Sequence, residues 1–337
     1  MRIAARSHQG GRQQGRLRVV TYHRVADVAD GNTVLDPRLI STTPALFARQ
    51  MEHLARHYRV VTLHEVIDAV NGRASLPAHA TLITFDDGYR DLKDHAFPVL
   101  RRLQLPATVF VATAFPADPE RAFWWDRVYR ALIGTPRRAW ELPPLGLLRF
   151  RDKAERTESI RRLQNHIVTL PHSEGMRLVD AICAEAGARD AAPASVLSWQ
   201  ELREAGAHGV TVAAHTRTHP ILTNVPLEQA RAEIAGSLVD VERETGAAAP
   251  AFCYPNGNEN EAVVRAVREA GVAVAFTTSN GHNDLARAHP LRLSRQNIYR
   301  NSSLPVFRAR LSAMGGYLDA WRSRVRLPRS NHARTAP

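Results

Sequence analysis

The sequence predicts an α/β protein, a distorted (β/α) barrel of about seven parallel strands with a mainly helical insertion. From Leu17 onward, short apolar runs of strand length alternate with longer stretches in which apolar residues recur with a helical period. This alternation is typical of repeated βα units. Several apolar runs end in polar, reactive residues, as expected where barrel strands deliver side chains to one rim. Length alone would allow two domains for 337 residues, but barrels of this size often form one.

Seven segments are predicted to be strands because they are apolar runs of strand length. They are 18–22, 60–63, 82–85, 107–112, 209–213, 251–254 and 272–277. Helical patterns lie between them, over 44–56, 63–70, 91–103, 198–205, 227–245 and 261–270. Start and stop signals support several helices: Ser198 to Glu201 has the pattern of a capping box, Gly246 and Gly271 stand where helices should end, and Pro106 separates a helix from a strand.

Residues 115–197 interrupt this rhythm. They contain the aromatic run Phe123-Trp124-Trp125-Asp126, followed by Pro-rich and then charged helical stretches. We interpret them as a helical insertion in a barrel that spans 17–312. Residues 1–16 are predicted to be a disordered basic terminus, and 313–337, which have no clear period, a basic surface extension.

The composition indicates a globular protein with a basic surface. Hydrophobic residues make up 44% and charged residues 23%, and the net charge is +12, with much of the arginine near the two ends. We interpret these arginines first as solvated tails, although they also fit peripheral contact with an anionic membrane. Aromatic residues do not interleave with the basic clusters, so no nucleic-acid partner is expected. The oligomeric state is left open.

Two cysteines, Cys183 and Cys253, are too few for a disulfide framework or a cysteine-based metal cluster. The sequence contains no apolar run of signal-peptide or membrane-span length. As written, it therefore predicts a cytoplasmic protein. Export would require a segment upstream of a misassigned start, since the predicted fold begins only at Leu17.

Four predicted strands end in residues that can do chemistry: His23, the pair Asp86-Asp87, His215, and Pro255-Asn256-Gly257. Because parallel barrel strands bring their carboxyl ends to one rim, we expect these residues to lie together. The Asp pair follows the apolar run 81–83, where an unpaired carboxylate would be costly to bury. Such a pair indicates a binding or catalytic site.

His215 and His219 are spaced i, i+4, which we expect to place both imidazoles on one side of a helical or near-helical turn. Two imidazoles and one carboxylate leave coordination positions open, as a catalytic metal site requires. Zinc suits these ligands, although cobalt, nickel or iron would also fit. Adjacent carboxylates repel each other, so one of Asp86 and Asp87 should bind the metal and the other take protons. Alternation at a strand end would point them in different directions.

Together these residues resemble the polysaccharide deacetylases, the family-four carbohydrate esterases, over nearly all of 17–311. The matching motifs are TFDDG at Thr84–Gly88, HTRTH at His215–His219 and FCYPNG at Phe252–Gly257. The resemblance implies that the protein removes N-acetyl groups from amino sugars. It also implies that Asp86 is the general base and that the metal ligands are Asp87, His215 and His219.

The run Tyr22-His23-Arg24 is similar to a motif of a permuted branch that includes poly-N-acetylglucosamine deacetylases. This resemblance implies that His23 is the general acid. A histidine near the last strand, where the family usually carries its catalytic histidine, is the alternative, and His282 and His289 are the histidines found there.

Cys253 stands where many relatives carry an arginine that pairs with the base, so another cation must orient Asp86. Arg295 resembles an arginine that the permuted branch has near its C-terminal end, and Arg292 is the alternative. For substrate binding, the resemblance implies the third motif, with Tyr254, Pro255 and Asn256, the last through its backbone N–H. Among the tryptophans, Trp125 is our choice for a sugar-stacking wall, although tryptophans such as Trp124, Trp125 and Trp199 are at least as often core residues.

The sequence therefore predicts a metal-dependent hydrolase that removes N-acetyl groups from a polysaccharide or from its lipid-linked precursor. One alternative is a deformylase or deacetylase of a lipid-linked monosaccharide, which the basic ends would suit. Another is a metal-dependent carbohydrate-binding protein without catalysis, in which Asp86 would have no role.

Overall fold

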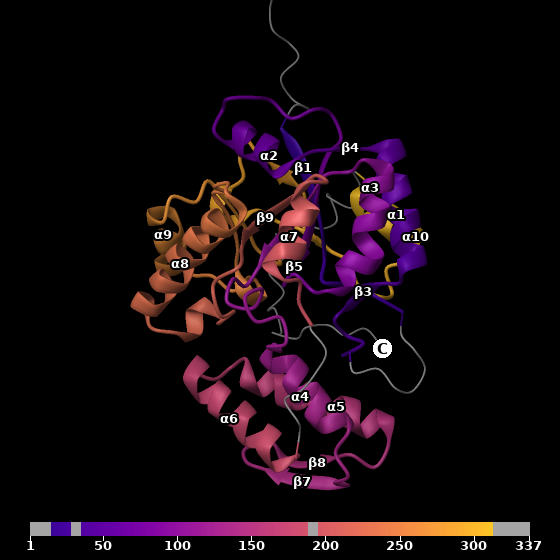
Figure 1. The fold of residues 1–337 in the computed structure, drawn as a ribbon, viewed down its shortest axis with the longest axis vertical. Helices are drawn as coiled ribbons and strands as arrows, with labels where there is room; N and C mark the ends of the chain where they lie inside the picture. The colour runs from indigo at the N-terminus through magenta and orange to yellow at the C-terminus, as the bar shows by residue number, and fades with distance from the viewer. Residues whose placement is uncertain (1–14, 28–34, 188–194, 313–337) are drawn as a thin grey trace, which may run out of the picture.

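A curled sheet of parallel strands forms the main body of the computed structural model, which describes residues 15–27, 35–187 and 195–312 (Figure 1). Six strands pair in the order β11-β10-β9-β6-β5-β1, and each neighbouring pair is parallel. They are β1 (Arg16–Tyr22), β5 (Ala80–Asp86), β6 (Ala107–Val111), β9 (Val210–Ala214), β10 (Ala251–Cys253) and β11 (Val274–Phe276). A seventh parallel strand, β13 (Gln296–Asn297), pairs with β1. These seven strands confirm the predicted distorted (β/α) barrel.

The two edges of this sheet are linked through residues 293–297. On the β11 side, Leu293 donates its N–H to the carbonyl of Ala275 at 2.8 Å and accepts the N–H of Thr277 at 3.0 Å. Directly after Arg295, β13 pairs with β1, starting at Gln296. Arg295 lies between the two attachments and is fully buried, so the segment that closes the barrel also carries a cation into it.

Two elements of the structure differ from their predicted bounds or type. The strand expected over 60–63 is only β4 (Arg59–Val60), which pairs with the start of β5. The capping box of Thr62 starts α2 (Leu63–Val70) directly after it. The helix expected over 91–103 begins as a π-helix, η1 (Leu92–Ala96), and continues as α3 (Phe97–Leu103). Pro98 lacks the N–H that an α-helical bond would use there.

Helices and short strands cover the barrel. Ser198 forms the predicted capping box, and Gly246 ends the longest of these helices at a φ of 73°, where a left-handed residue is required. The helices are α1 (Pro44–His57), α7 (Trp199–Gly206), α8 (Leu227–Thr245), α9 (Glu261–Glu269) and α10 (Leu304–Leu311), with 3-10 turns at Leu222–Asn224, Pro255–Gly257 and Pro290–Arg292. The short strands are β2 (Arg24–Val25), β3 (Ile40–Thr42) and β12 (Asn283–Asp284).

The elements within 115–197 lie together beside the barrel, in the lower half of Figure 1. They are α4 (Trp124–Ile133), the hairpin of β7 (Ala139–Leu142) and β8 (Gly146–Arg149), α5 (Lys153–Ile167) and α6 (His172–Glu185). They share an apolar core of their own, which includes Leu132, Leu163 and Val179. A separate cluster, with Tyr89 and Ala112 from the barrel and Phe123 from the insertion, joins the two bodies.

The predicted basic ends fall almost entirely on 1–14 and 313–337, which lie outside the described residues; Arg16 already belongs to β1. Both cysteines are buried and neither is in a disulfide. Among the helices that the structure describes, none combines the length and the apolar character needed to cross a membrane.

Candidate metal and catalytic site

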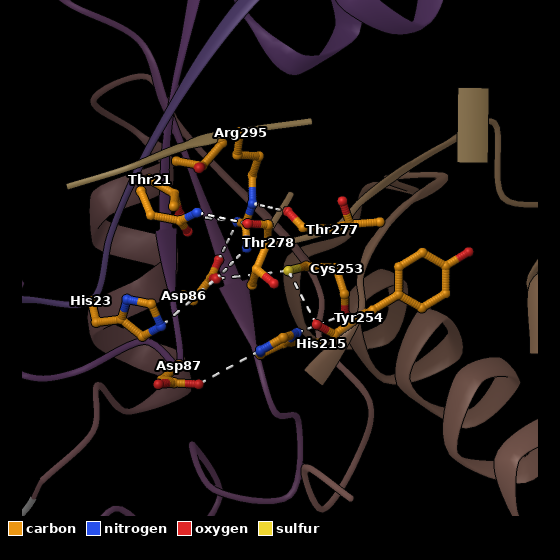
Figure 2. Close-up of polar contacts among 12 residues, drawn as sticks. Thr21, His23, Asp86, Asp87, His215, Cys253, Tyr254, Thr277, Thr278 and Arg295 are labelled. Atoms are coloured by element: carbon orange, nitrogen blue, oxygen red, sulfur yellow. Dashed lines mark hydrogen bonds and ion pairs between the residues drawn. The ribbon is translucent and has the colours of Figure 1, made fainter. Parts of the chain in front are cut away.

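Several of the predicted site residues lie together at the carboxyl ends of the strands: His23, Asp86, Asp87, His215 and Arg295 (Figure 2). Asp86 is the last residue of β5, His23 follows β1, and His215 follows β9. Asp87 adopts a left-handed φ of 69°, which turns the chain sharply after the strand and separates the two carboxylates. Asp86 faces His23 and the barrel interior, whereas Asp87 faces the histidines from the β9 end (Figure 2). The side chains therefore point in different directions, as expected from the strand end.

Asp87, His215 and His219 bring three potential ligand atoms together. The two Nε2 atoms of the histidines are 3.2 Å apart, and Asp87 Oδ1 lies 3.3 Å from that of His219 and 3.6 Å from that of His215. Ligand bonds of about 2.0–2.1 Å at a tetrahedral ion would separate neighbouring ligand atoms by about 3.4 Å. The three atoms thus have the spacing of one face of a tetrahedral divalent metal site, and the residues fit such an ion.

The protonation of His215 suits a ligand. Its Nδ1 lies 2.7 Å from the carbonyl oxygen of Cys253, so Nδ1 carries the proton and donates it, leaving the Nε2 lone pair directed at Asp87. Burial, followed by the neighbouring His219, lowers the pKa of His215 to about 4. The imidazole is therefore neutral at neutral pH. For Asp87, burial opposes ionisation, but the hydrogen bond and charge of His219 outweigh it and lower the pKa of the carboxyl.

The expectation of a helical turn across His215 to His219 is wrong. The segment is an irregular loop in which Thr216 and His219 have left-handed φ values of 66° and 61°. The hydroxyl of Thr216 accepts the N–H of His219 at 3.0 Å, so a local side-chain bond replaces the helical one. Non-glycine residues in this backbone region are strained, and such strain persists where surrounding contacts impose it.

Helix α8 supplies those contacts. Glu233, 8% exposed, accepts the backbone N–H groups of Arg217 and Thr218 at 2.7 and 2.8 Å. Asp240 accepts two hydrogen bonds from the Arg217 guanidinium, at 2.8 and 3.1 Å. Gly236 lies between them, and a Cβ there would sit 2.5 Å from Arg217 Nε. None of these three residues was predicted to support the site, although their i, i+3, i+7 spacing places all three on one face of the predicted helix.

Asp86 is held by Arg295, whose guanidinium pairs with its carboxylate. Arg295 Nη1 and Nη2 each donate to one oxygen of Asp86 at 2.7 Å, and Nη1 also donates to Thr21 Oγ1 at 3.0 Å. Burial alone would raise the pKa of Asp86, but the charge and hydrogen bonds of Arg295 outweigh it and hold the pKa below its usual value. Arg292, the alternative, instead pairs with Glu259 and Glu261.

His23 lies on the open side of Asp86. Its Nε2 is 4.0 Å from Asp86 Oδ2, and its side chain is 35% exposed, so it can reach solvent and a bound molecule. The other two candidates are engaged elsewhere: His282 lies 2.9 Å from the carbonyl of Arg310, and His289 accepts the N–H of Leu291 at the start of a 3-10 turn.

A second group of potential ligands consists of Asp86, His215 and Cys253. It suits an ion less well because both oxygens of Asp86 already bind Arg295. Burial also raises the pKa of the Cys253 thiol well above its usual value, and a metal requires the thiolate. The Cys253 sulfur lies 3.7 Å from Asp86 Oδ2, so it packs against this carboxylate beside the guanidinium.

The substrate-binding residues expected from the third motif divide into two groups. Tyr254 is fully buried, and its hydroxyl donates to the carbonyl of Leu291 at 3.0 Å; Figure 2 shows the ring directed away from Asp86. The expectation that this side chain binds substrate is therefore wrong, because strand β10 and the 3-10 turn enclose it. Pro255 is also buried, whereas Asn256 is exposed and has a left-handed φ of 58°.

Trp125 lies directly beside the metal-ligand group. Its ring centroid is 4.7 Å from that of His219 in an edge-to-face arrangement, and the Phe123 ring is stacked on it at 4.6 Å. The residue is half-buried, so part of the ring remains open beside His219. Trp199 belongs to the barrel core, and Trp124 packs on the core of the insertion.

Comparison with known proteins gives the same family as the sequence motifs. The family model for polysaccharide deacetylases matches residues 73–275. The poly-beta-1,6-N-acetyl-D-glucosamine N-deacetylase of Escherichia coli K12 is 29% identical over 120 residues, which are 34% of this chain and 17% of that protein. The chain therefore matches less than a fifth of the length of this curated relative.

Solved structures share the fold. The Streptococcus pyogenes deacetylase PplD, in complex with acetate, has a TM-score of 0.61 at 18% identity and covers 88% of this chain and 98% of its own. IcaB from Ammonifex degensii has a TM-score of 0.56 at 20% identity and covers 89% of this chain and 99% of its own. With the family model spanning more than half of its residues, the chain belongs to the polysaccharide deacetylase family, whose members hydrolyse the amide bonds of N-acetyl sugars.

Proposed function

We propose that this protein is a metal-dependent deacetylase that removes N-acetyl groups from a polymer of N-acetylglucosamine. The observation that carries the proposal is the division of labour between the two neighbouring carboxylates. Asp87 faces two imidazole nitrogens at ligand spacing, whereas Asp86 stays outside that group and is paired with Arg295. A protein that only bound a sugar would have no use for the second, ionised carboxylate.

Asp87, His215 and His219 would hold the metal, and zinc suits two nitrogens and one oxygen. When bound, a divalent ion polarises the acetyl carbonyl and lowers the pKa of a water molecule. Asp86 would serve as the general base toward the attacking water, since Arg295 keeps the carboxylate ionised and oriented. His23, across from Asp86 and open to solvent, protonates the departing amine. Asn256, an exposed residue that follows the carboxyl end of β10, would donate its backbone N–H to the oxyanion.

The substrate class rests on the relatives. The curated Escherichia coli relative is named as a deacetylase of poly-beta-1,6-N-acetyl-D-glucosamine, and an N-acetylated amino sugar has the acetamide that this chemistry requires. Trp125, half-open beside His219, offers a flat apolar surface for the face of a sugar ring.

Acetate release from N-acetylglucosamine oligomers tests the proposal. The purified protein should release acetate, lose this activity with a chelator and regain it with zinc or cobalt. The matched variant His289→Gln, away from the rim, should behave as the wild type, whereas His23→Gln should lose roughly 100-fold or more in kcat. Zinc-loaded protein that releases no acetate from any oligomer, or activity that a chelator leaves intact, would contradict the proposal.

A further inference from the structure

The aromatic run of the insertion is linked to the catalytic rim by a buried ion pair. Arg24, which directly follows His23, is 2% exposed. Its Nη1 donates to Asp91 at 2.9 Å and its Nη2 donates to Asp126 of α4 at 3.1 Å. The guanidinium carbon also lies 3.5 Å from the centre of the Tyr89 ring. One cation thus contacts the π-helix end, the loop after Asp87 and the insertion.

The first turn of α4 makes a second contact with Tyr89, the residue whose ring lies against Arg24. Trp125 donates its indole N–H to the hydroxyl of Tyr89 at 2.8 Å, and its carbonyl accepts a hydrogen bond from Gln164 of α5 at 3.0 Å. Trp125 and Asp126 are adjacent, so the ion pair and the indole bond together set the position of the Trp125 ring beside His219.

Two members of this network are near neighbours in the sequence of a proposed catalytic or metal-binding residue. Arg24 follows His23, and Tyr89 comes two residues after Asp87. The contact between Arg24 and Asp126 therefore sets the separation between two walls of one site, His23 on the barrel side and Trp125 on the insertion side.

We propose that Arg24 and Asp126 are positioning residues that hold Trp125 as the sugar-contacting wall of the site. The inference rests on the proposed function and adds to it that the insertion selects a sugar substrate over a small acetyl compound. Replacing a buried ion pair by apolar residues of similar volume often costs no stability. The charges and directed hydrogen bonds of Arg24 and Asp126, however, restrict the orientation of α4. An apolar contact would leave this orientation less defined.

The experiment compares two substrates in the full-length, zinc-loaded protein. In Asp126→Asn, kcat/KM for an N-acetylglucosamine pentamer should fall at least tenfold more than kcat/KM for 4-nitrophenyl acetate, mainly through KM. Zinc stoichiometry should remain that of the wild type. The matched control is Asp180→Asn, which removes the partner of Arg127, the next residue of α4, at a site 64% exposed; it should leave the ratio of the two substrates unchanged.

A milder variant keeps the inference testable if Asp126→Asn folds poorly. Tyr89→Phe retains the ring under Arg24 and deletes only the hydroxyl that accepts the Trp125 N–H, so the substrate ratio should shift at least threefold in the same direction. An equal loss on both substrates, or no loss, in the folded variants would overturn the inference. Failure of the proposed function is a different result, since the wild type itself would then release no acetate from the pentamer.

Discussion

Replacement of Asp86 by Asn should reduce stability, because Arg295 loses its charged partner, and activity, because the proposed base is removed. The carboxylate and Arg295 share two hydrogen bonds of 2.7 Å, and their side chains are 3% and 0% exposed. Removing one partner of a buried ion pair costs about 3–5 kcal/mol because the other charge is left uncompensated. Asn keeps one acceptor for the guanidinium, and Thr277 and Thr21 keep theirs. We therefore expect a loss near the lower limit, about 3 kcal/mol.

The direction of the pKa shift of Asp86 determines how its contribution to stability changes with pH. Because the folded state lowers the pKa of Asp86, the stabilisation is fully present above the pKa of an unfolded aspartate, about 3.9, and is lost as pH falls toward the lower folded value. The difference in unfolding free energy between wild type and Asp86→Asn should therefore be constant from about pH 5 to 8 and shrink below about pH 4.

Urea denaturation at several pH values measures this difference, and acetate release measures the loss of the base, roughly 100- to 10,000-fold. The double variant Asp86→Asn/Arg295→Met should recover most of the stability and none of the activity, since it removes the uncompensated charge but not the need for a base. A single variant as stable as the wild type at pH 7, or a difference that does not narrow in acid, would refute the reasoning.

Three further predictions concern the metal ligands and the loop that presents them. His219→Ala should abolish stoichiometric zinc binding while the protein remains folded, as measured by elemental analysis and circular dichroism; full zinc content would contradict the assigned ligand set. Glu233→Gln, which removes the ionised acceptor of two loop N–H groups, should weaken zinc affinity roughly 10- to 100-fold in competition with a chelating dye. Gly236→Ala places a Cβ 2.5 Å from Arg217 Nε and should cost about 1–3 kcal/mol in urea denaturation. Gly206→Ala, where a Cβ meets nothing within 4 Å, is its control, and equal midpoints for the two would contradict the packing argument.

Local signals were sufficient to predict most of the fold. The helix expected over 227–245 has those bounds in the structure, because Pro226 and Gly246 mark its ends in the sequence itself. By contrast, β13 was not predicted. It is two residues long and exists only because it pairs with β1, and such a pairing leaves no periodicity to detect.

The site was predictable where a motif names a residue and its neighbours, and not where the partner is distant. The convergence of Asp87 with His215 and His219 follows from parallel strands sharing a rim. The left-handed backbone at His219 and the inward orientation of Tyr254 depend on packing that no local pattern describes. The pairing of Arg24 with Asp126 joins residues 102 positions apart, and neither gives any sign of the other.

The separation of Asp86 and Arg295 by 209 positions has a consequence for biosynthesis. During translation, most of the polypeptide must leave the ribosome before the acidic residue can meet its guanidinium. Until then the nascent barrel exposes an open edge and an unneutralised negative charge at its centre, both of which favour recognition by chaperones and proteases. A stalled or prematurely terminated chain would therefore be eliminated as a misfolded protein instead of accumulating as a partly formed enzyme.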